Sequence, residues 1–347
     1  MVTIATRSTP QKRRFGQTNC ANRHFHCIDS GMLEILKTNE GVLEELRIDN
    51  VQEGSWYNLI DPSNEEIEKV SKALNLDDYF LRTCLDLDER SRIEIEDGHL
   101  LVIVNIPIMK DESTFDTLPM GIIFTSSAII TVCPKENKII QSFNKETAKF
   151  FDTKNRVHFM LTILFRSSKF YLRDLHHINR YTEDIENQLR KTMGNSELFE
   201  LLEVQKSLVY FTTAINNNQV MLQKLMRLTK RTTEIPNFHF SEDEIDILED
   251  VIIDNKQALE MVEMHRNVLE NMMDAFASII SNNVGYVVKF LTALTILFAI
   301  PTMFASFWGM NTKVPGEGTL QWFYIVAATS LLATIISAIL FVRKKML

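Results

Sequence analysis

Residues 290–311 read FLTALTILFAIPTMFASFWGMN, and this uncharged stretch decides the architecture of the chain. The charge-free run begins at Phe290, directly after Lys289, and no formal charge follows before Lys313. About 20 consecutive apolar residues are enough for a helix to cross the hydrocarbon core of a bilayer. The stretch therefore predicts a first membrane-spanning helix over residues 290–311.

A second uncharged run covers residues 318–342 and is followed at once by Arg343-Lys344-Lys345. We expect a second span at 320–342, joined to the first by a periplasmic or extracellular loop at 312–319. Basic residues beside a span favour the cytoplasmic side, so residues 343–347 form a basic cytoplasmic tail. Two spans in a hairpin place both termini in the cytoplasm, which predicts a multi-pass protein of the inner or plasma membrane.

The first span carries a stripe of small and hydroxylated side chains at spacings of three and four residues, which places them on one helix face. Its members are Thr292, Thr295, Ala299, Thr302 and Ser306. Close packing between helices in lipid is one interpretation. The lining of a pore is the other. Pro301 removes the hydrogen bond to the Leu297 carbonyl and predicts a kink or a free oxygen within the membrane.

Composition indicates a large soluble part with a small membrane part. The chain has 347 residues, of which 45% are hydrophobic and 24% charged, which is ample for a core outside the membrane. Its net charge of −8 argues against nucleic acid as a partner and suits the handling of cations. The cysteines, Cys20, Cys27, Cys84 and Cys133, form no disulfide pattern, so we expect a reducing compartment.

Residues 1–31 differ from the rest because basic residues outnumber acidic ones and no core pattern is present. No apolar stretch follows that would make a signal peptide. We interpret them as a disordered or mis-started leader, with Met32 as a plausible true start. Cys20, His24, His26 and Cys27 match no standard zinc spacing, so they are not assigned to a metal site.

Residues 32–150 alternate between strand and helix signals, which predicts a cytoplasmic α/β domain. The expected strands are Val42–Ile48, Ser55–Ile60, Leu100–Met109, Gly121–Thr125 and Ala128–Cys133. Ser63 and Glu66 form a capping box that predicts the start of a helix. No glycine-rich phosphate loop, nucleophile elbow or helical His-Glu metal motif occurs, so the sequence does not favour an enzyme.

Residues 155–230 show helical periodicity broken near Gly194-Asn195, which predicts two antiparallel cytoplasmic helices within residues 151–240. Ser241 and Glu244 form a second capping box at the start of a stalk, residues 241–289. No proline or glycine interrupts the stalk before Gly285, so residues 242–308 would form one helix about 100 Å long. Its apolar residues follow a 3,4 repeat interrupted by Asn255 and Arg266, and we expect this seam to be the assembly surface.

The stalk is strongly acidic between Ser241 and Asp274, where Lys256 and Arg266 are the only basic residues besides His265. So many like charges on one packed helix repel one another unless cations screen them. The stalk is therefore a candidate cation-sensing element. His176 and His177 are adjacent in a helix and point in different directions, so they are not expected to share an ion.

Gly309-Met310-Asn311, the two carboxyl-terminal spans and the basic tail together resemble the CorA magnesium transporters. Trp308 stands at the family's aromatic position before the glycine. The resemblance implies a funnel-shaped homopentamer with an α+β cytoplasmic domain (an α/β sandwich), a very long stalk helix and a two-helix transmembrane hairpin. Its implied partners are further copies of the chain, membrane lipid and divalent cations, and its implied cargo and regulator is Mg²⁺.

The resemblance also implies roles for individual residues. Gly309, Met310 and Asn311 would form the selectivity filter, with five Asn311 amides at the outer mouth. The pore-lining positions fall at Val288, Leu291, Thr295, Ala299 and Thr302, with Val288 and Leu291 as an apolar gate. The family's loop has a Pro-Glu pair where this chain has Pro315-Gly316-Glu317, so Glu317 is the expected outer acidic ring.

The regulatory metal site of the family falls at Asp250 on the stalk. Its partner position on the neighbouring copy falls near Thr83, which is not acidic, so Asp86 or Asp88 is the expected substitute. The resulting hypothesis is a channel or transporter for magnesium influx, with cobalt and nickel as further ions, gated by cytoplasmic magnesium.

Two alternatives stay open. A transporter for zinc or another transition metal would share the architecture, but the spans contain no histidine or cysteine. A non-transporting membrane receptor with a coiled-coil signalling domain would need neither the hydroxyl stripe nor Asn311. Divalent cation flux would separate transport from signalling.

Overall fold

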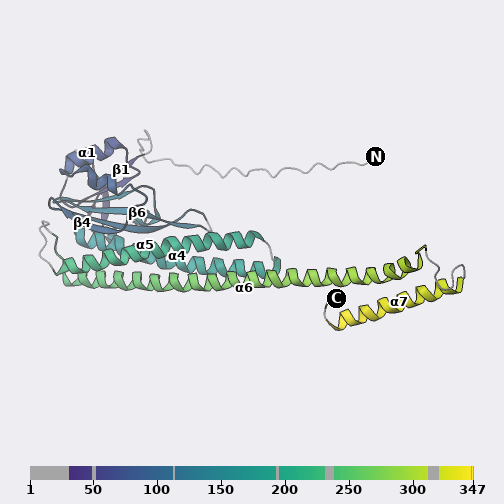
Figure 1. Cartoon of the computed structure of the whole chain (residues 1–347). Helices are drawn as coiled ribbons and strands as arrows, with labels where there is room; N and C mark the ends of the chain where they lie inside the picture. Colours follow the sequence, from purple (N-terminus) through teal and green to yellow (C-terminus); the bar gives the residue numbers. More distant parts are fainter. Residues whose placement is uncertain are drawn as a thin grey trace.

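The computed structural model describes residues 31–48, 52–111, 114–192, 195–230, 238–311, 320–344 and 346. The leader, the loop with Glu317 and Cys20, His24, His26 and Cys27 lie outside these residues. The described chain forms an α/β unit, a very long helix and a carboxyl-terminal helix (Figure 1). This is the fold class expected from the sequence.

A seven-stranded sheet forms the centre of the α/β unit in the described part of the chain. Its strands are β1 (Met32–Asn39), β2 (Val42–Glu45), β3 (Ser55–Ile60), β4 (Arg92–Glu96), β5 (His99–Met109), β6 (Phe115–Phe124) and β7 (Ala128–Cys133). They lie in the order β2-β1-β3-β7-β6-β5-β4. Only β3 and β7 pair in parallel within this sheet. All six residues of both strands are buried, as expected for the centre of a covered sheet.

Helices cover both faces of the sheet. On one face lie α1 (Asn64–Leu74) and α2 (Asp78–Thr83), which bury Ile67, Val70 and Phe80 against it. The other face carries α3 (Lys138–Gln141), the short 3₁₀ turn η1 (Ala148–Phe150), α4 (Arg156–Thr192) and α5 (Asn195–Thr229). Figure 1 shows α1 above the sheet, α4 and α5 below it, and α6 beneath those two helices.

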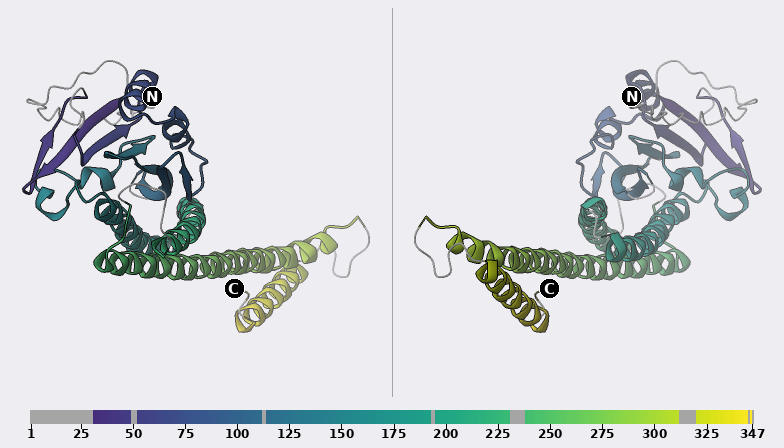
Figure 2. Two further views of the ribbon diagram at one scale, coloured as in Figure 1. Left: turned by 90° about the vertical axis from the view of Figure 1, so that its left-hand side faces the viewer. Right: turned by 90° about the vertical axis from the view of Figure 1, so that its right-hand side faces the viewer.

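The helix α6 (Glu242–Trp308) has 67 residues and extends far beyond the α/β unit (Figure 1). At about 1.5 Å per residue it is on the order of 100 Å long. The last helix, α7 (Leu320–Arg343), runs back beside the end of α6 (Figures 1 and 2). Both predicted capping boxes are present, with Ser63 accepting from the Glu66 amide and Ser241 from the Glu244 amide.

The strand prediction matched β3 and β7 at both ends and β5 to within one residue, and it placed β2 at its first residue, Val42, but ended it at Ile48 instead of Glu45. β1 and β4 were missed, and β6 begins at Phe115 rather than Gly121. β4 has the sequence RIEIE and lies at the edge of the sheet, paired with β5 alone. An edge strand tolerates charged side chains, so its hydrophobic signal is weak.

The prediction that the apolar seam of the stalk is an assembly surface was wrong. Leu248 packs in the core that α4 shares with the sheet, and Val262, Leu269 and Phe276 are buried in a second core with α4 and α5. The chain's own helices therefore use this seam. The side chains that remain exposed on the stalk are different ones, including Ile253, Met264 and Val268.

Candidate functional site: the membrane spans and the outer triplet

The end of α6 and the whole of α7 are long and apolar enough to cross a membrane. Their side chains are largely exposed in a single chain, as expected for surfaces that face lipid or further copies. The residues buried within the described spans are Ala293 and Ser330, which are both small. Small residues allow two helices in lipid to approach closely.

The Gly309-Met310-Asn311 triplet follows directly on the last residue of α6. Gly309 is the C-cap residue, with φ −85° and ψ 4°, and its amide donates to the Ala305 carbonyl at 2.9 Å. Met310 and Asn311 are exposed beyond that bond. Because Gly309 ends the helix, Asn311 is not needed as its cap, and its side-chain amide has no hydrogen-bond partner among the described residues.

The hydroxyl stripe is exposed, and the hydroxyls of its three threonines donate hydrogen bonds to backbone carbonyls of the same helix. Thr292 donates to the Val288 carbonyl at 2.7 Å, Thr295 to Leu291 at 2.8 Å and Thr302 to Phe298 at 2.9 Å. Such bonds to the carbonyl four residues earlier are common for threonine in membrane helices. Each hydroxyl oxygen keeps lone pairs that can accept from the water shell of a cation.

The stripe is not the surface on which α6 meets α7. Ala293 is fully buried, and at 100° per residue it lies on nearly the opposite side of the helix from Thr295 and Thr302. Ala299 is exposed like the threonines, and so are Val288 and Leu291 at the amino-terminal end of the row. Packing within one chain therefore does not account for the stripe, which leaves it to face lipid, another copy or a pore.

Asp250, the candidate regulatory ligand, is exposed on the stalk, and no described residue pairs with it. Its neighbour Asp254, one turn later, is buried, and its Oδ2 lies 2.8 Å from Lys169 Nζ of α4. Glu244 is also buried and serves the capping box. Several stalk acids thus have partners within the chain, and Asp250 is one that is left for another ligand.

Asp86 and Asp88 are exposed in the segment between α2 and β4, where Asp86 Oδ1 accepts from the Asp88 amide at 3.0 Å. Within the described residues, no three acidic, histidine or cysteine side chains gather as a metal site. A regulatory site built from Asp250 with Asp86 or Asp88 of a neighbouring copy stays a prediction. Glu317, the expected outer acid, lies outside the described residues.

A family model described as "CorA-like Mg2+ transporter protein" matches residues 51–344. The chain belongs to the CorA family. This is a family of transporters, not of enzymes, and the match covers the α/β unit from β3 onward, the stalk and both spans.

Curated CorA proteins are similar along most of their length. The cobalt/magnesium transport protein CorA of Methanocaldococcus jannaschii is 26% identical over 296 residues, covering 83% of this chain and 90% of the relative. The cobalt/magnesium transport protein CorA of Thermotoga maritima is 21% identical over 306 residues, which cover 84% of this chain and 83% of the relative. The magnesium transport protein CorA of Helicobacter pylori strain 26695 is 21% identical and covers 84% and 89%.

Solved structures share the fold. The complete CorA magnesium transporter of M. jannaschii superposes with a TM-score of 0.76 at 24% identity, covering 90% of this chain and 98% of that one. The full-length CmaX protein gives a TM-score of 0.66 at 14% identity, covering 90% and 100%. The ZntB cytoplasmic domain of Vibrio parahaemolyticus gives a TM-score of 0.56 at 13% identity, covering 73% of this chain and 100% of that one. Proteins with different names share this architecture, so the fold alone does not fix the ion.

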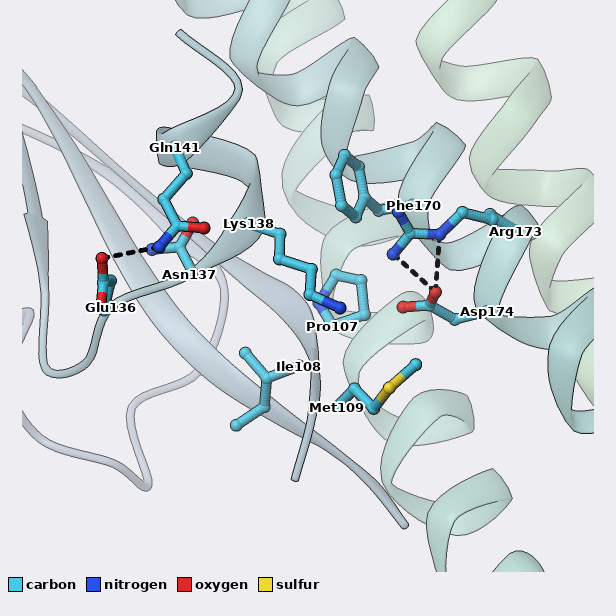
Figure 3. A pocket seen from close by; sticks show the side chains of 10 residues that line it. All are labelled: Pro107, Ile108, Met109, Glu136, Asn137, Lys138, Gln141, Phe170, Arg173 and Asp174. Atoms are coloured by element: carbon cyan, nitrogen blue, oxygen red, sulfur yellow. Dashed lines mark hydrogen bonds and ion pairs between the residues drawn. The ribbon is translucent and has the colours of Figure 1, made fainter. Parts of the chain in front are cut away.

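A pocket of about 210 Å³ lies between β5, α3 and α4, away from the spans (Figure 3). Its buried acid is Asp174, whose Oδ1 accepts from Arg173 at 2.9 and 2.8 Å. Burial raises the pKa of Asp174, and the bond from Arg173 opposes that rise. Lys138 points toward this pair (Figure 3).

A buried polar network, missed from the sequence, holds the long helices on the sheet. Asn105 of β5 and Asn218 of α5 bond twice, from the Asn105 amide to Asn218 Oδ1 at 2.9 Å and from Asn218 Nδ2 to the Asn105 carbonyl at 2.8 Å. Ser91 donates to the same Asn218 oxygen at 2.6 Å. The Tyr171 hydroxyl of α4 donates to the Asn105 carbonyl at 2.9 Å.

A buried asparagine on α6, next to this network, was visible in the sequence. Asn255 interrupts the apolar repeat, and its Nδ2 donates to the Ile215 carbonyl at 3.2 Å and to Gln219 Oε1 at 2.8 Å. Asn255 is therefore a buried polar anchor of the stalk on α5 rather than a break in its packing.

We predict that Asn218→Ala lowers the free energy of unfolding of the α/β unit and its helices by about 1–3 kcal/mol, because it leaves the buried Asn105 amide and carbonyl without their asparagine partner. The urea midpoint of the full chain in detergent, followed by circular dichroism, measures this. Asn216→Ala makes the same chemical change at an exposed α5 position and should leave the midpoint unchanged. Equal midpoints for the two variants would show that the network does not stabilise the fold.

Proposed function

We propose that this chain is a divalent cation transporter that carries Mg²⁺ inward through a pore shared among several copies. The single observation that carries the proposal is the exposed Asn311 amide, which has no partner among the described residues and lies directly beyond an apolar helix whose hydroxyl stripe is also exposed. One chain supplies one such helix, so a closed pore needs several copies around an axis. Membership of the CorA family supports a homopentamer.

The chemistry of the triplet suits magnesium. Mg²⁺ dehydrates reluctantly and usually keeps several waters, so a ring of neutral amide oxygens can contact the hydrated ion without trapping it. The threonine oxygens continue this neutral path along Thr302 and Thr295. Val288 and Leu291, exposed and apolar, are placed to close the pore by excluding water.

We place the protein in a cell membrane with both termini in the cytoplasm. The basic end of α7 supports this orientation through the positive-inside rule. The α/β unit and the stalk then lie in the cytoplasm, residues 312–319 lie outside, and Glu317 is placed near the outer mouth. Lipid surrounds the exposed apolar faces of α7.

Cobalt is a second candidate cargo because curated relatives are named cobalt/magnesium transport proteins, and nickel belongs to the same series of divalent ions. Zinc is less suited, since the spans offer no histidine or cysteine, the side chains that bind zinc in proteins. A receptor that does not transport would leave the exposed triplet without a role.

The decisive variants are Asn311→Gly and Asn311→Ala. If the amide oxygen selects the ion, both abolish Mg²⁺ uptake into liposomes while the oligomer still assembles. Asn282→Ala, an equal change on an exposed part of α6 ahead of the span, should keep wild-type uptake. Asn311→Asp should alter the ion preference or slow release, since a carboxylate ring holds divalent ions more tightly. Normal uptake by an assembled Asn311→Gly protein would leave the proposed filter untenable.

Regulation is proposed to act through Asp250. Cytoplasmic Mg²⁺ bound between Asp250 and Asp86 or Asp88 of a neighbouring copy would screen the acids and favour a closed state. Asp250→Asn and Asp250→Lys should then weaken the inhibition of uptake by internal Mg²⁺. Glu249→Gln removes an adjacent exposed charge and should keep the wild-type inhibition curve. If both Asp250 variants also keep it, the stalk is not the sensor.

A further inference from the structure

Two tryptophans join the outer end of α6 to the start of α7. Trp308 is the last residue of α6 and is half-buried, and Trp322 is the third residue of α7 and is 41% exposed. Their ring centroids lie 6.3 Å apart with the planes 18° from parallel. Aromatic rings at this separation attract each other when stacked with an offset.

Trp308 is bonded directly to the triplet that carries the proposed filter. The Gly309 amide makes the last bond to the helix, at the Ala305 carbonyl, and Met310 and Asn311 are exposed beyond it. With no side-chain partner for Asn311 among the described residues, the direction of the triplet follows that of the last turn of α6.

That last part of α6 is attached to the rest of the helix by one bond fewer than usual. Pro301 lies within α6 and has no amide proton, so the Leu297 carbonyl lacks its ordinary helical partner. A helix bends most easily at such a point. A contact from α7 to the part of α6 that follows Pro301 can therefore determine the position of Trp308, and with it that of Asn311.

We propose that Trp322 is a positioning residue for Asn311: by stacking on Trp308 it fixes the segment beyond Pro301 against α7 and so sets the radius of the amide ring. The inference rests on the proposed function. It assigns to α7 a part in ion selection, because Trp322 acts on the triplet through Trp308.

A simpler role for Trp322 is that of an interfacial anchor, because tryptophan and tyrosine gather at membrane surfaces. Phe323 and Tyr324 lie on the same turn, are more than 60% exposed, and contact each other. They supply aromatic bulk without touching Trp308. Phe323→Leu is therefore the matched control for the loss of an aromatic side chain at this depth.

The transport test compares Trp322→Leu, Trp322→Phe and Phe323→Leu as assembled full chains in liposomes. We expect Trp322→Leu to raise the Mg²⁺ concentration for half-maximal uptake by up to about tenfold, the factor that a stacked aromatic pair can supply, and to change the preference for Mg²⁺ over Co²⁺. Trp322→Phe should restore most of the affinity, and Phe323→Leu should match the wild type. Unchanged half-saturation and preference in Trp322→Leu would overturn the positioning role.

The stacking itself is tested without transport. In a Trp56→Phe background, which removes the tryptophan of the α/β unit, the two remaining indoles should give an exciton couplet in circular dichroism. Trp308→Phe and Trp322→Phe should each abolish it, and Phe323→Leu should retain it. A spectrum without the couplet overturns the inference. If the couplet is present but the chain transports no divalent cation, the stacking is confirmed. The proposed function and the positioning role then both fail.

Discussion

The structure depends on one constraint: a chain that enters a bilayer must satisfy every backbone hydrogen bond internally, and here a single helix does so from the α/β unit to the end of the first span. α6 begins at the Ser241 capping box and reaches Trp308 with only Pro301 missing from its ladder of amide donors. Asp250 and the segment that leads to Asn311 therefore lie on one continuous helix, with Pro301 as its single weak point. The α/β unit and α7 are arranged around this helix at its two ends (Figure 1).

The first half of α6, outside the span, is held by the chain itself. Its apolar seam is buried against α4 and α5, and Asn255 and Asp254 add a hydrogen-bonded anchor and an ion pair on that side. The face carrying Ile253, Met264 and Val268 is left exposed. One side of the stalk is thus fixed to the helices that pack on the sheet, and the other side is available to further copies. A pore shared around an axis requires both surfaces.

Sequence patterns predicted the elements whose signals are local. The two capping boxes, the buried strands β3 and β7, and the length of α6 follow from neighbours within a few residues. The edge strand β4 and the Asn105–Asn218 pair, 113 residues apart, depend on tertiary contacts that no local pattern contains. For the site, the triplet and the stripe were located from spacing and resemblance, and the structure adds that they are exposed. Their roles stay predictions, and the Trp308–Trp322 contact had no sequence signal.

The account's central claim is that cytoplasmic Mg²⁺ changes the arrangement of the stalk helices of neighbouring copies. A spin label at Met264→Cys, in a chain with Cys20 and Cys27 replaced by serine, reports distances between copies on the exposed stalk face by pulsed electron resonance. Cys84 and Cys133 are buried and can stay. The account predicts a narrow set of distances with Mg²⁺ and a broader, longer one after chelation, because unscreened acids repel. Identical distributions in both conditions, or no distances between copies, would contradict it.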